Sequence, residues 1–348
     1  MDPLAKDLAS LLATHRLRYV SAEELNVHRQ RCGRGFVYRD AQGKTVREAE
    51  DLHRFKSLAI PPAWQQVRLA PEPAWHLQAL GCDALGRLQR RYHVAWEQIR
   101  NADKLARLKR FAIALPRVRA QVLEDLRKPP CEPDALCAVV VRLIDLAHLR
   151  PGSDSALEEI GSRGATTLAP SNVNVDGHGI HIAFRGKSGQ WVETQVTDTL
   201  LSRRLARLKE SNRHRLFRIA NGASTVDLSC ADVNGYLQRI AGIAISAKDF
   251  RTYDASAVAL WDLAATLLPA SQRACQCALA AVSRKVAQRL HNTPAIARKS
   301  YIHPVIVDAW LAGELQDGIG ERLRRSTRRT AFSSRPEAAL RKFLYSRF

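Results

Sequence analysis

The first hundred residues carry short runs of alternating apolar and polar positions. These runs predict strands over residues 33–38, 67–69, 75–79 and 87–93, with a turn at residues 42 and 43. Between them, Leu52, Phe55 and Leu58 recur at helical spacing, which predicts one helix over residues 48–58. Pro61 and Pro62 follow directly and end it, because proline cannot continue a helix. This part of the chain is therefore expected to be a small β-rich module.

Helical spacing dominates from residue 95 onward. It predicts amphipathic helices over residues 102–114, 118–126, 198–209, 232–241, 248–268 and 272–290. The stretch 134–149 is apolar nearly all round, which is typical of a central buried helix. Ser246 and Asp249 have the spacing of a capping box, so Arg251 is expected in the first or second turn of its helix.

Residues 173–196 depart from the helical pattern. Ile180, Ile182 and Phe184 alternate before a glycine-rich turn at residues 186–189, and further β-type residues follow beyond it. This predicts a β-hairpin with Lys187 at its tip. The whole pattern predicts an α+β protein. A small β-rich N-terminal domain covers residues 1–97, and a larger, mostly α-helical domain with a small hairpin sheet covers residues 98–348.

The chain is strongly basic. Lys and Arg number 54 against 34 Asp and Glu, a formal net charge of +20, and 42 of the basic residues are Arg. Basic side chains release condensed counterions from phosphates, and the planar guanidinium fits phosphate oxygens, so a nucleic acid is the expected partner. The alternative is a genomic base composition that raises Arg and Ala everywhere. The basic tail at residues 322–348 fits a solvated helix or flexible arm as well as a DNA contact.

Other sequence features narrow the cellular setting. No stretch of about 20 uncharged apolar residues is present, and the N-terminus lacks a signal-peptide pattern, so we expect no membrane span. The seven cysteines are scattered, without the two-residue spacing of a zinc knuckle. Reduced thiols in a cytoplasmic protein are the simplest interpretation.

Several polar residues stand in positions that suit chemistry. Arg150 ends the predicted buried helix, Lys187 lies at the hairpin tip, and Lys248 and Arg251 are three residues apart on one helix face. Tyr301 lies among basic residues downstream of a proline-containing turn. Each has an ordinary explanation when taken alone, because an arginine can cap a helix, a turn lysine can be solvated and a tyrosine can pack.

Six sequence blocks in order resemble the type IB DNA topoisomerases, in particular the small poxvirus-like kind that many bacteria carry. The blocks are residues 35–38 (GFVY), 60–64 (IPPAW), 78–93, 184–189 (FRGKSG), 248–252 (KDFRT) and 292–304. The similarity covers about residues 15–310. It implies the catalytic fold shared by tyrosine recombinases and topoisomerases IB. It also implies relaxation of supercoiled DNA by transient single-strand cleavage and religation through a 3′-phosphotyrosyl intermediate, without ATP, metal or another cofactor.

The resemblance assigns roles by position. Tyr301 is implied as the nucleophile, Arg150 and Arg251 as donors to the non-bridging phosphate oxygens, and Lys187 as the general acid, with Lys248 assisting. The residue types suit this chemistry, because a phenol with an ordinary pKa of about 10 needs nearby cations, and an alkoxide leaving group needs a proton. Asn292 stands where the family often has a histidine as the last oxyanion donor. We expect the adjacent His291 to be a bystander.

The resemblance further implies that the N-terminal module is a clamp that closes over double-stranded DNA. The contacts implied for it are Gln78, Arg87, Gln89, Arg91, Tyr92 and His93. For Tyr92 and His93, cross-strand packing is an equally good interpretation. After Arg150 the chain departs from the family with residues 151–156 (PGSDSA), so no DNA contact is carried over there. One active site per duplex suffices, so we expect a monomer associated with the nucleoid.

Two other functions remain open at this point. A tyrosine recombinase or integrase shares the Arg, Lys, Arg and Tyr set, but such enzymes usually place His three residues before the second Arg, where this chain has Lys248. A non-catalytic basic DNA-binding relative is the third reading, which charge alone does not exclude.

Overall fold

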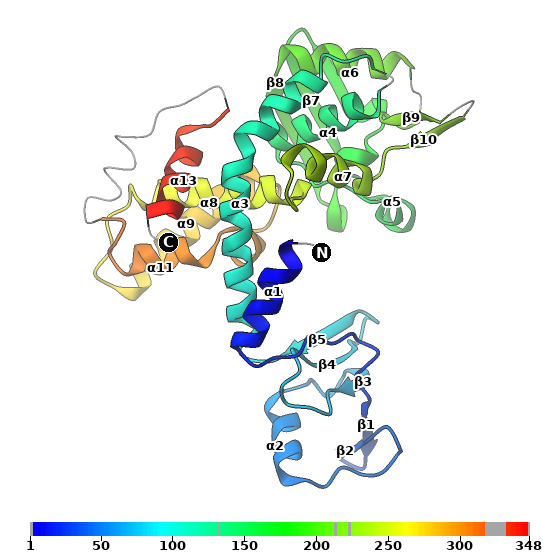
Figure 1. Ribbon diagram of the computed structural model, residues 1–348, viewed down its shortest axis with the longest axis vertical. Helices are drawn as coiled ribbons and strands as arrows, with labels where there is room; N and C mark the ends of the chain where they lie inside the picture. Colours follow the sequence, from blue (N-terminus) through cyan, green and yellow to red (C-terminus); the bar gives the residue numbers. More distant parts are fainter. Residues whose placement is uncertain (1–2, 131, 212–213, 222–223, 317–331, 347–348) are drawn as a thin grey trace. The chain divides into compact units, whose positions relative to one another are not determined.

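The computed structural model describes residues 3–130, 132–211, 214–221, 224–316 and 332–346 (Figure 1). The chain divides into two compact units, Met1–Lys104 and Leu105–Phe348. The division falls inside one long helix, α3 (Trp96–Asp125). No helix of the described ranges combines the length and apolar character that crossing a membrane requires.

The N-terminal unit is built on an antiparallel sheet with strand order β2-β1-β3-β4-β5. Its strands are β1 (Val27–Cys32), β2 (Gly35–Arg39), β3 (Gln65–Leu69), β4 (Leu77–Cys82) and β5 (Leu88–Tyr92), accompanied by α1 (Pro3–Thr14) and α2 (Ala49–Ser57). Phe55 of α2 is buried with Val67, Leu69 and Ala79 of the sheet. The helix therefore covers one sheet face with the apolar stripe that its sequence carries.

Most elements of this unit follow the sequence pattern, and β1 and α1 are additions to it. Strand β1 reads VHRQRC, and only its first residue, Val27, is buried. A central strand with so little apolar alternation gives no period-2 signal. It is held by its neighbours, since β1 pairs with β2 on one side and with β3 on the other.

The C-terminal unit is organised around α4 (Pro133–Ala147), which is buried along almost its whole length, as predicted. Figure 1 shows helices and strands gathered around it. The surrounding helices are α5 (Asp154–Ile160), α6 (Thr199–Ser211), α7 (Cys230–Ala241), α8 (Ala247–Leu263), α9 (Gln272–Arg289), α10 (Pro294–Ile296), α11 (Pro304–Leu311) and α13 (Arg335–Ser346). The predicted hairpin is a three-stranded sheet, β6 (Val173–Asp176), β7 (Gly179–Arg185) and β8 (Trp191–Thr197), and β9 (Arg218–Asn221) and β10 (Ser224–Asp227) form a separate pair.

Two sequence expectations need correction. The predicted helices 102–114 and 118–126 are one helix, because α3 continues through Pro116. The described end of the basic tail is not a solvated arm, since α13 buries Leu340, Phe343 and Leu344 in the core. The part of that tail at residues 317–331 lies outside the described residues.

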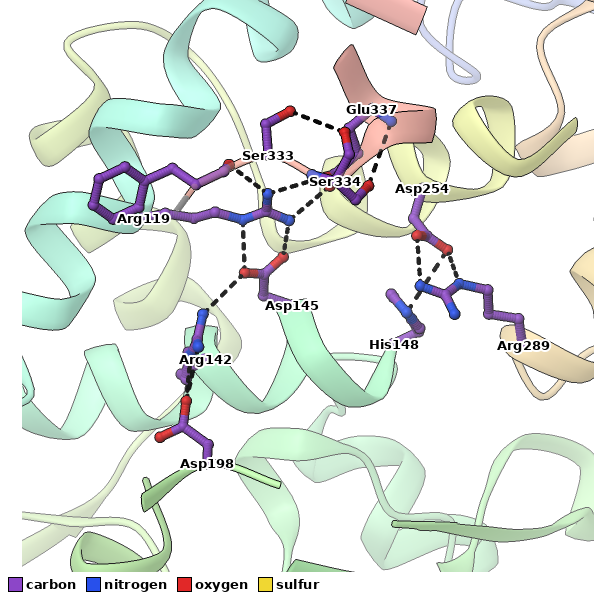
Figure 2. A network of polar contacts seen from close by, with 11 residues as sticks. Arg119, Arg142, Asp145, His148, Asp198, Asp254, Arg289, Ser333, Ser334 and Glu337 are labelled. Carbon is purple, nitrogen blue, oxygen red and sulfur yellow. Dashed lines mark hydrogen bonds and ion pairs between the residues drawn. The ribbon is translucent and has the colours of Figure 1, made fainter. Parts of the chain in front are cut away.

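An ion-pair network ties α13 to the centre of the unit (Figure 2). Arg119 of α3 binds Asp145 of α4 through two hydrogen bonds of 2.8 and 2.6 Å. Its guanidinium also contacts Glu337 of α13 at 2.7 Å. All three side chains are largely buried, and each buried charge has an opposite partner, as the low polarity of the interior requires. The network holds α4, which leads directly to the candidate site.

Candidate active site

Arg150 lies just beyond the C-terminal end of α4. His148 caps that helix in the left-handed conformation, with φ of 51°, and so turns the chain toward Arg150. The loop behind Arg150 is tightly packed: Ala165 N donates to Arg150 O at 2.8 Å. A Cβ added at Gly164 would meet Arg150 O at 2.6 Å and Gly152 Cα at 2.5 Å, too close for any side chain. Glycine at 164 therefore fixes the backbone that carries Arg150.

Arg251 is the central cation of the site, and only 1% of its surface is exposed. It lies in the second turn of α8, as the capping-box spacing predicts. Its Nη1 donates to the carbonyl of His148 and its Nη2 to the carbonyl of Leu290 at 2.9 Å, which links the ends of α4 and α9. Burial lowers the pKa of this guanidinium, and the neighbouring Tyr301 phenol acts in the opposite direction.

Tyr301 is the last residue of a π-helical turn, Ala297–Tyr301. Its ring centre lies 5.1 Å from the guanidinium carbon of Arg251, and 9% of its surface is exposed. Burial alone raises the pKa of the Tyr301 phenol. The charges of Arg251 and Arg150, with a hydrogen bond from Arg251, outweigh that effect and hold the pKa below its ordinary value. The phenol is therefore easier to deprotonate than a free tyrosine.

Asn292 completes the cluster from the end of α9. Its backbone N donates to Ala287 O at 2.9 Å, which closes the last turn of the helix. Its Oδ1 accepts a hydrogen bond from Arg150 Nη2. Because the amide oxygen is used in this way, the NH2 group is the part of Asn292 left to donate to a substrate oxygen. The structure thus brings together four of the predicted residues: Arg150, Arg251, Asn292 and Tyr301.

The two lysines are not part of this cluster. Lys187 opens a short 3-10 turn between β7 and β8, and its side chain is exposed. Lys248 is exposed in the first turn of α8. Neither makes an ion pair with a carboxylate in the described part of the chain. Lys187 is nevertheless close in sequence to the site, since the preceding Gly186 lines the same pocket as Arg150 and Arg251.

That pocket contains two basic residues that the sequence reading did not assign. Its lining consists of Leu149, Arg150, Arg163, Phe184, Gly186, Val192, Arg251, Leu290 and His291. His291, which was expected to be a bystander, faces the pocket because its own backbone is left-handed, with φ of 51°. Regular helical geometry, which the expectation assumed, would have aimed the side chain elsewhere. No local sequence pattern marks Arg163 as a site residue, because only the tertiary fold brings its loop to the pocket.

A partly buried ion pair supports the cluster from behind (Figure 2). Asp254, one turn after Arg251 on α8, accepts two hydrogen bonds from Arg289 of α9 at 2.6 and 3.0 Å. The same carboxylate lies 3.7 Å from His148 Nε2 at the end of α4. Burial lowers the pKa of His148, and the Asp254 charge opposes this shift. Asp254 therefore joins the three segments that carry Arg150, Arg251 and Asn292.

In the N-terminal unit, the predicted DNA contact of Gln78 does not fit the structure. Gln78 is 2% exposed. Its Nε2 donates to the carbonyls of Pro73 at 3.0 Å and Trp75 at 2.7 Å, and its Oε1 accepts from Arg54 at 3.0 Å. Both ends of the amide are used inside the unit, so Gln78 has a structural role here.

The other predicted contacts lie in or next to β5 with more of their surface accessible. Arg87 and Gln89 both bind the carboxylate of Asp83, and the hydrogen bond from Arg87 lowers the pKa of Asp83 to about 2. Arg91 Nη2 donates to Ala59 O at 3.1 Å. Tyr92 is 38% exposed but also stacks on Trp96, and His93 Nδ1 accepts from the backbone of Ala95. Their contacts with DNA stay predictions.

A groove on the N-terminal sheet adds basic residues that the sequence reading missed. It is lined by His28, Arg29 and Gln30 of β1, Gln66, Val67 and Arg68 of β3, Leu80 and Cys82 of β4, and Leu88 of β5. The sequence did not predict β1, and the residues of a strand that is not predicted cannot be assigned to a face of the sheet. This groove joins basic and amide side chains on one surface, which suits a phosphate backbone.

A β-rich unit followed by a helical unit with clustered Arg, Arg and Tyr residues is the arrangement implied for the DNA-acting tyrosine enzymes, topoisomerases IB and tyrosine recombinases. Comparison with known families separates the two. The family described as eukaryotic DNA topoisomerase I, catalytic core, matches residues 94–310. The family described as bacterial DNA topoisomerase IB, N-terminal domain, matches residues 35–83.

A relative supports the same assignment. DNA topoisomerase 1B of Acanthamoeba polyphaga mimivirus is 25% identical over 284 residues, which cover 79% of this chain and 84% of the relative. The chain therefore belongs to the type IB DNA topoisomerases. It is an isomerase that acts on DNA, with the mixed α+β architecture expected from its sequence.

Proposed function

We propose that this enzyme relaxes supercoiled DNA by cutting and resealing one strand through a 3′-phosphotyrosyl intermediate, with no requirement for ATP or a metal ion. The observation that carries the proposal is the buried Tyr301 phenol beside Arg251, with a pKa held below its ordinary value. A phenol held beside a buried guanidinium with a lowered pKa suits attack on an anionic substrate.

The first step is attack of the Tyr301 oxygen on phosphorus. The phenol gives its proton to solvent, the new O–P bond forms, and the bond from phosphorus to the 5′ oxygen breaks. Negative charge builds on the non-bridging oxygens as this happens. Arg150 and Arg251 offer guanidinium donors at that place, and Asn292 offers a neutral amide donor, so the three residues stabilise the transition state more than the ground state.

The leaving 5′ oxygen needs a proton, and we assign that proton to Lys187, with Lys248 assisting. Both side chains are exposed in the free protein. The turn that carries Lys187 starts at Gly186, which lines the pocket, so a small movement of a long side chain suffices to reach the leaving group. The nicked duplex then swivels, and the 5′ hydroxyl attacks the phosphotyrosine to restore the strand and return the proton to Lys187.

DNA is held by both units in this proposal. The N-terminal unit clamps the duplex through the groove of β1 and β3 and through Arg87, Gln89, Arg91, Tyr92 and His93. The net charge of +20 supports strong, salt-sensitive binding to phosphates. One active site per duplex is enough, so we expect the enzyme to act as a monomer and to associate with the nucleoid.

The test combines relaxation with trapping of the adduct. Supercoiled plasmid is expected to relax in EDTA without ATP, and detergent is expected to trap protein on the 3′ side of a nick. Protease digestion of the adduct is expected to leave a DNA-linked peptide that contains Tyr301. A requirement for ATP or metal would overturn the mechanism. Binding without any adduct would favour a non-catalytic relative, and strand exchange between two sites would favour a recombinase.

A further inference from the structure

His291 is a half-buried residue with a buried ring nitrogen, and the proposed mechanism assigns it no role. Its Nε2 is shielded from solvent and has no hydrogen-bond partner in the described part of the chain. The carbonyl of Ala147 interacts with the ring and acts to raise the pKa of His291, and since Nε2 has no partner, Nδ1 is the nitrogen that meets this carbonyl. The free nitrogen belongs to a side chain that lines the pocket with Arg150 and Arg251.

Two features of His291 cost stability in the free protein. A side chain other than glycine is strained at φ of 51°, and a buried nitrogen without a partner has lost its contact with water. Both costs come from the same residue at the same pocket. Strained backbone and unsatisfied buried polar atoms are concentrated at functional sites, where a bound ligand can supply the missing interaction.

We infer that His291 is a further phosphate-binding residue, whose Nε2–H donates to a non-bridging oxygen of the cleaved phosphodiester and which takes up a proton when DNA binds. The inference rests on the function proposed above, because it needs the phosphate to enter the pocket of Arg150 and Arg251. It assigns His291 the charge that Asn292, a neutral residue, does not supply at the adjacent position.

The proton follows from the way the ring is held. Nδ1–H is used on the Ala147 carbonyl, so a neutral ring presents a lone pair at Nε2, which repels a phosphate oxygen. Donation through Nε2 therefore requires the doubly protonated ring. When the phosphate binds, the new N–H bond forms with a proton from solvent, and the imidazolium donates it to the oxygen in a charge-assisted hydrogen bond.

The surrounding charges set the direction of this change. Burial, together with the charges of Arg251 on α8 and Arg150 after α4, lowers the pKa of His291, so the ring is neutral in the free protein. Arg163 lines the pocket from a third segment, and Lys187 follows Gly186 on a fourth. All of these neighbours are cationic, and the acidic groups that act on Arg251 are the Tyr301 phenol and the Asp254 carboxylate. A bound phosphate offsets the cations and thereby raises the pKa of His291.

The direct test measures protons taken up on binding. Tyr301→Phe blocks cleavage, and binding of a duplex to that protein is followed calorimetrically at about pH 7 in two buffers of different ionisation enthalpy. Adding His291→Asn is expected to remove up to about one proton of uptake per complex. Asparagine tolerates the left-handed backbone, so the variant keeps the fold. His178→Asn, in the exposed turn between β6 and β7, is the matched control and is expected to change nothing.

Kinetics give a second measurement in the protein with Tyr301 intact. His291→Asn and His291→Gly are expected to slow single-turnover cleavage roughly 10- to 100-fold, while Gly relieves the backbone and keeps or raises the melting temperature. Wild-type cleavage is expected to decline at high pH as the imidazolium is lost, and the variants are expected to lack that decline. Equal proton uptake and wild-type cleavage in both variants would overturn the role of His291 while leaving the proposed function intact. Absence of any adduct in the wild type would instead overturn the proposed function.

Discussion

The guanidinium of Arg251 lies 5.1 Å from the ring centre of Tyr301 and is itself fixed by the carbonyls of His148 and Leu290. Those two backbone contacts come from the ends of α4 and α9, so the cation is placed by the fold before DNA arrives. Preorganised charge of this kind stabilises a transition state without reorganisation at the moment of reaction. The relationship makes Tyr301 and Arg251 the first targets for mutation.

Tyr301→Phe is expected to bind DNA normally and to abolish relaxation, because it removes only the attacking oxygen. Plasmid relaxation and detergent-trapped adduct are the two readouts. Tyr345→Phe, at an exposed position on α13, is the control and is expected to relax plasmid at the wild-type rate. Normal relaxation by Tyr301→Phe would mean that another tyrosine is the nucleophile.

Arg251→Lys is expected to lower the cleavage rate by about 10²- to 10³-fold, as loss of one charged donor to a transition state does. It also changes the pH profile. The wild-type rate rises with pH as the phenol ionises, and Arg251 keeps the pKa of Tyr301 low. Weakening this contact raises the pKa of the phenol, so the rising limb of the profile is expected to move to higher pH. If the rising part of the pH–rate profile has the same midpoint in Arg251→Lys as in the wild type, Arg251 does not act on the pKa of Tyr301.

Asp254→Asn is expected to destabilise the protein by about 1–3 kcal/mol, a value below that of a fully buried pair because the side chain of Arg289 is 49% exposed. The catalytic rate is expected to fall more than DNA affinity does, since Asp254 positions the site and touches no substrate. Asp262→Asn removes a pair with Lys285, whose side chain is 62% exposed, and the expected loss is below about 1 kcal/mol. Thermal unfolding and single-turnover cleavage of both variants are the measurements, and equal losses would contradict the positioning role.

DNA affinity is expected to fall steeply with salt, because phosphate contacts by the basic surface dominate binding. Arg68→Ala, in the groove of the N-terminal sheet, is expected to reduce the slope of log affinity against log salt by about one. Gln78→Ala serves as a contrast, since its loss is expected to lower the melting temperature without changing that slope. A flat salt profile in the wild type would contradict the electrostatic argument.

The sequence predicted the architecture well because its signals are local. Helical spacing located α4, α6, α7, α8 and α9, and a capping box placed Arg251 in its helix. The misses have tertiary causes. Strand β1 has one buried residue and is held by its neighbours, and α3 continues through Pro116 although proline normally ends a helix.

The candidate site was predicted in part for the same reason. Motif order pointed to Arg150, Arg251, Asn292 and Tyr301, and the fold brings them together. His291 lines the pocket with a left-handed backbone, φ of 51°, and no pattern of residue types reports a backbone angle. Gln78 was assigned a DNA contact by resemblance to the family, whereas four neighbouring groups inside the unit use its amide.

Gly164 shows where the site is least tolerant of change. In Gly164→Ala, the added Cβ would lie 2.6 Å from the Arg150 carbonyl oxygen and 2.5 Å from Gly152 Cα, so it would collide with both. In a library of all single substitutions, this position is thus expected to rank with the nucleophile itself, even though it carries no functional group. The placement of the catalytic Arg150 therefore depends on the absence of a Cβ atom at position 164.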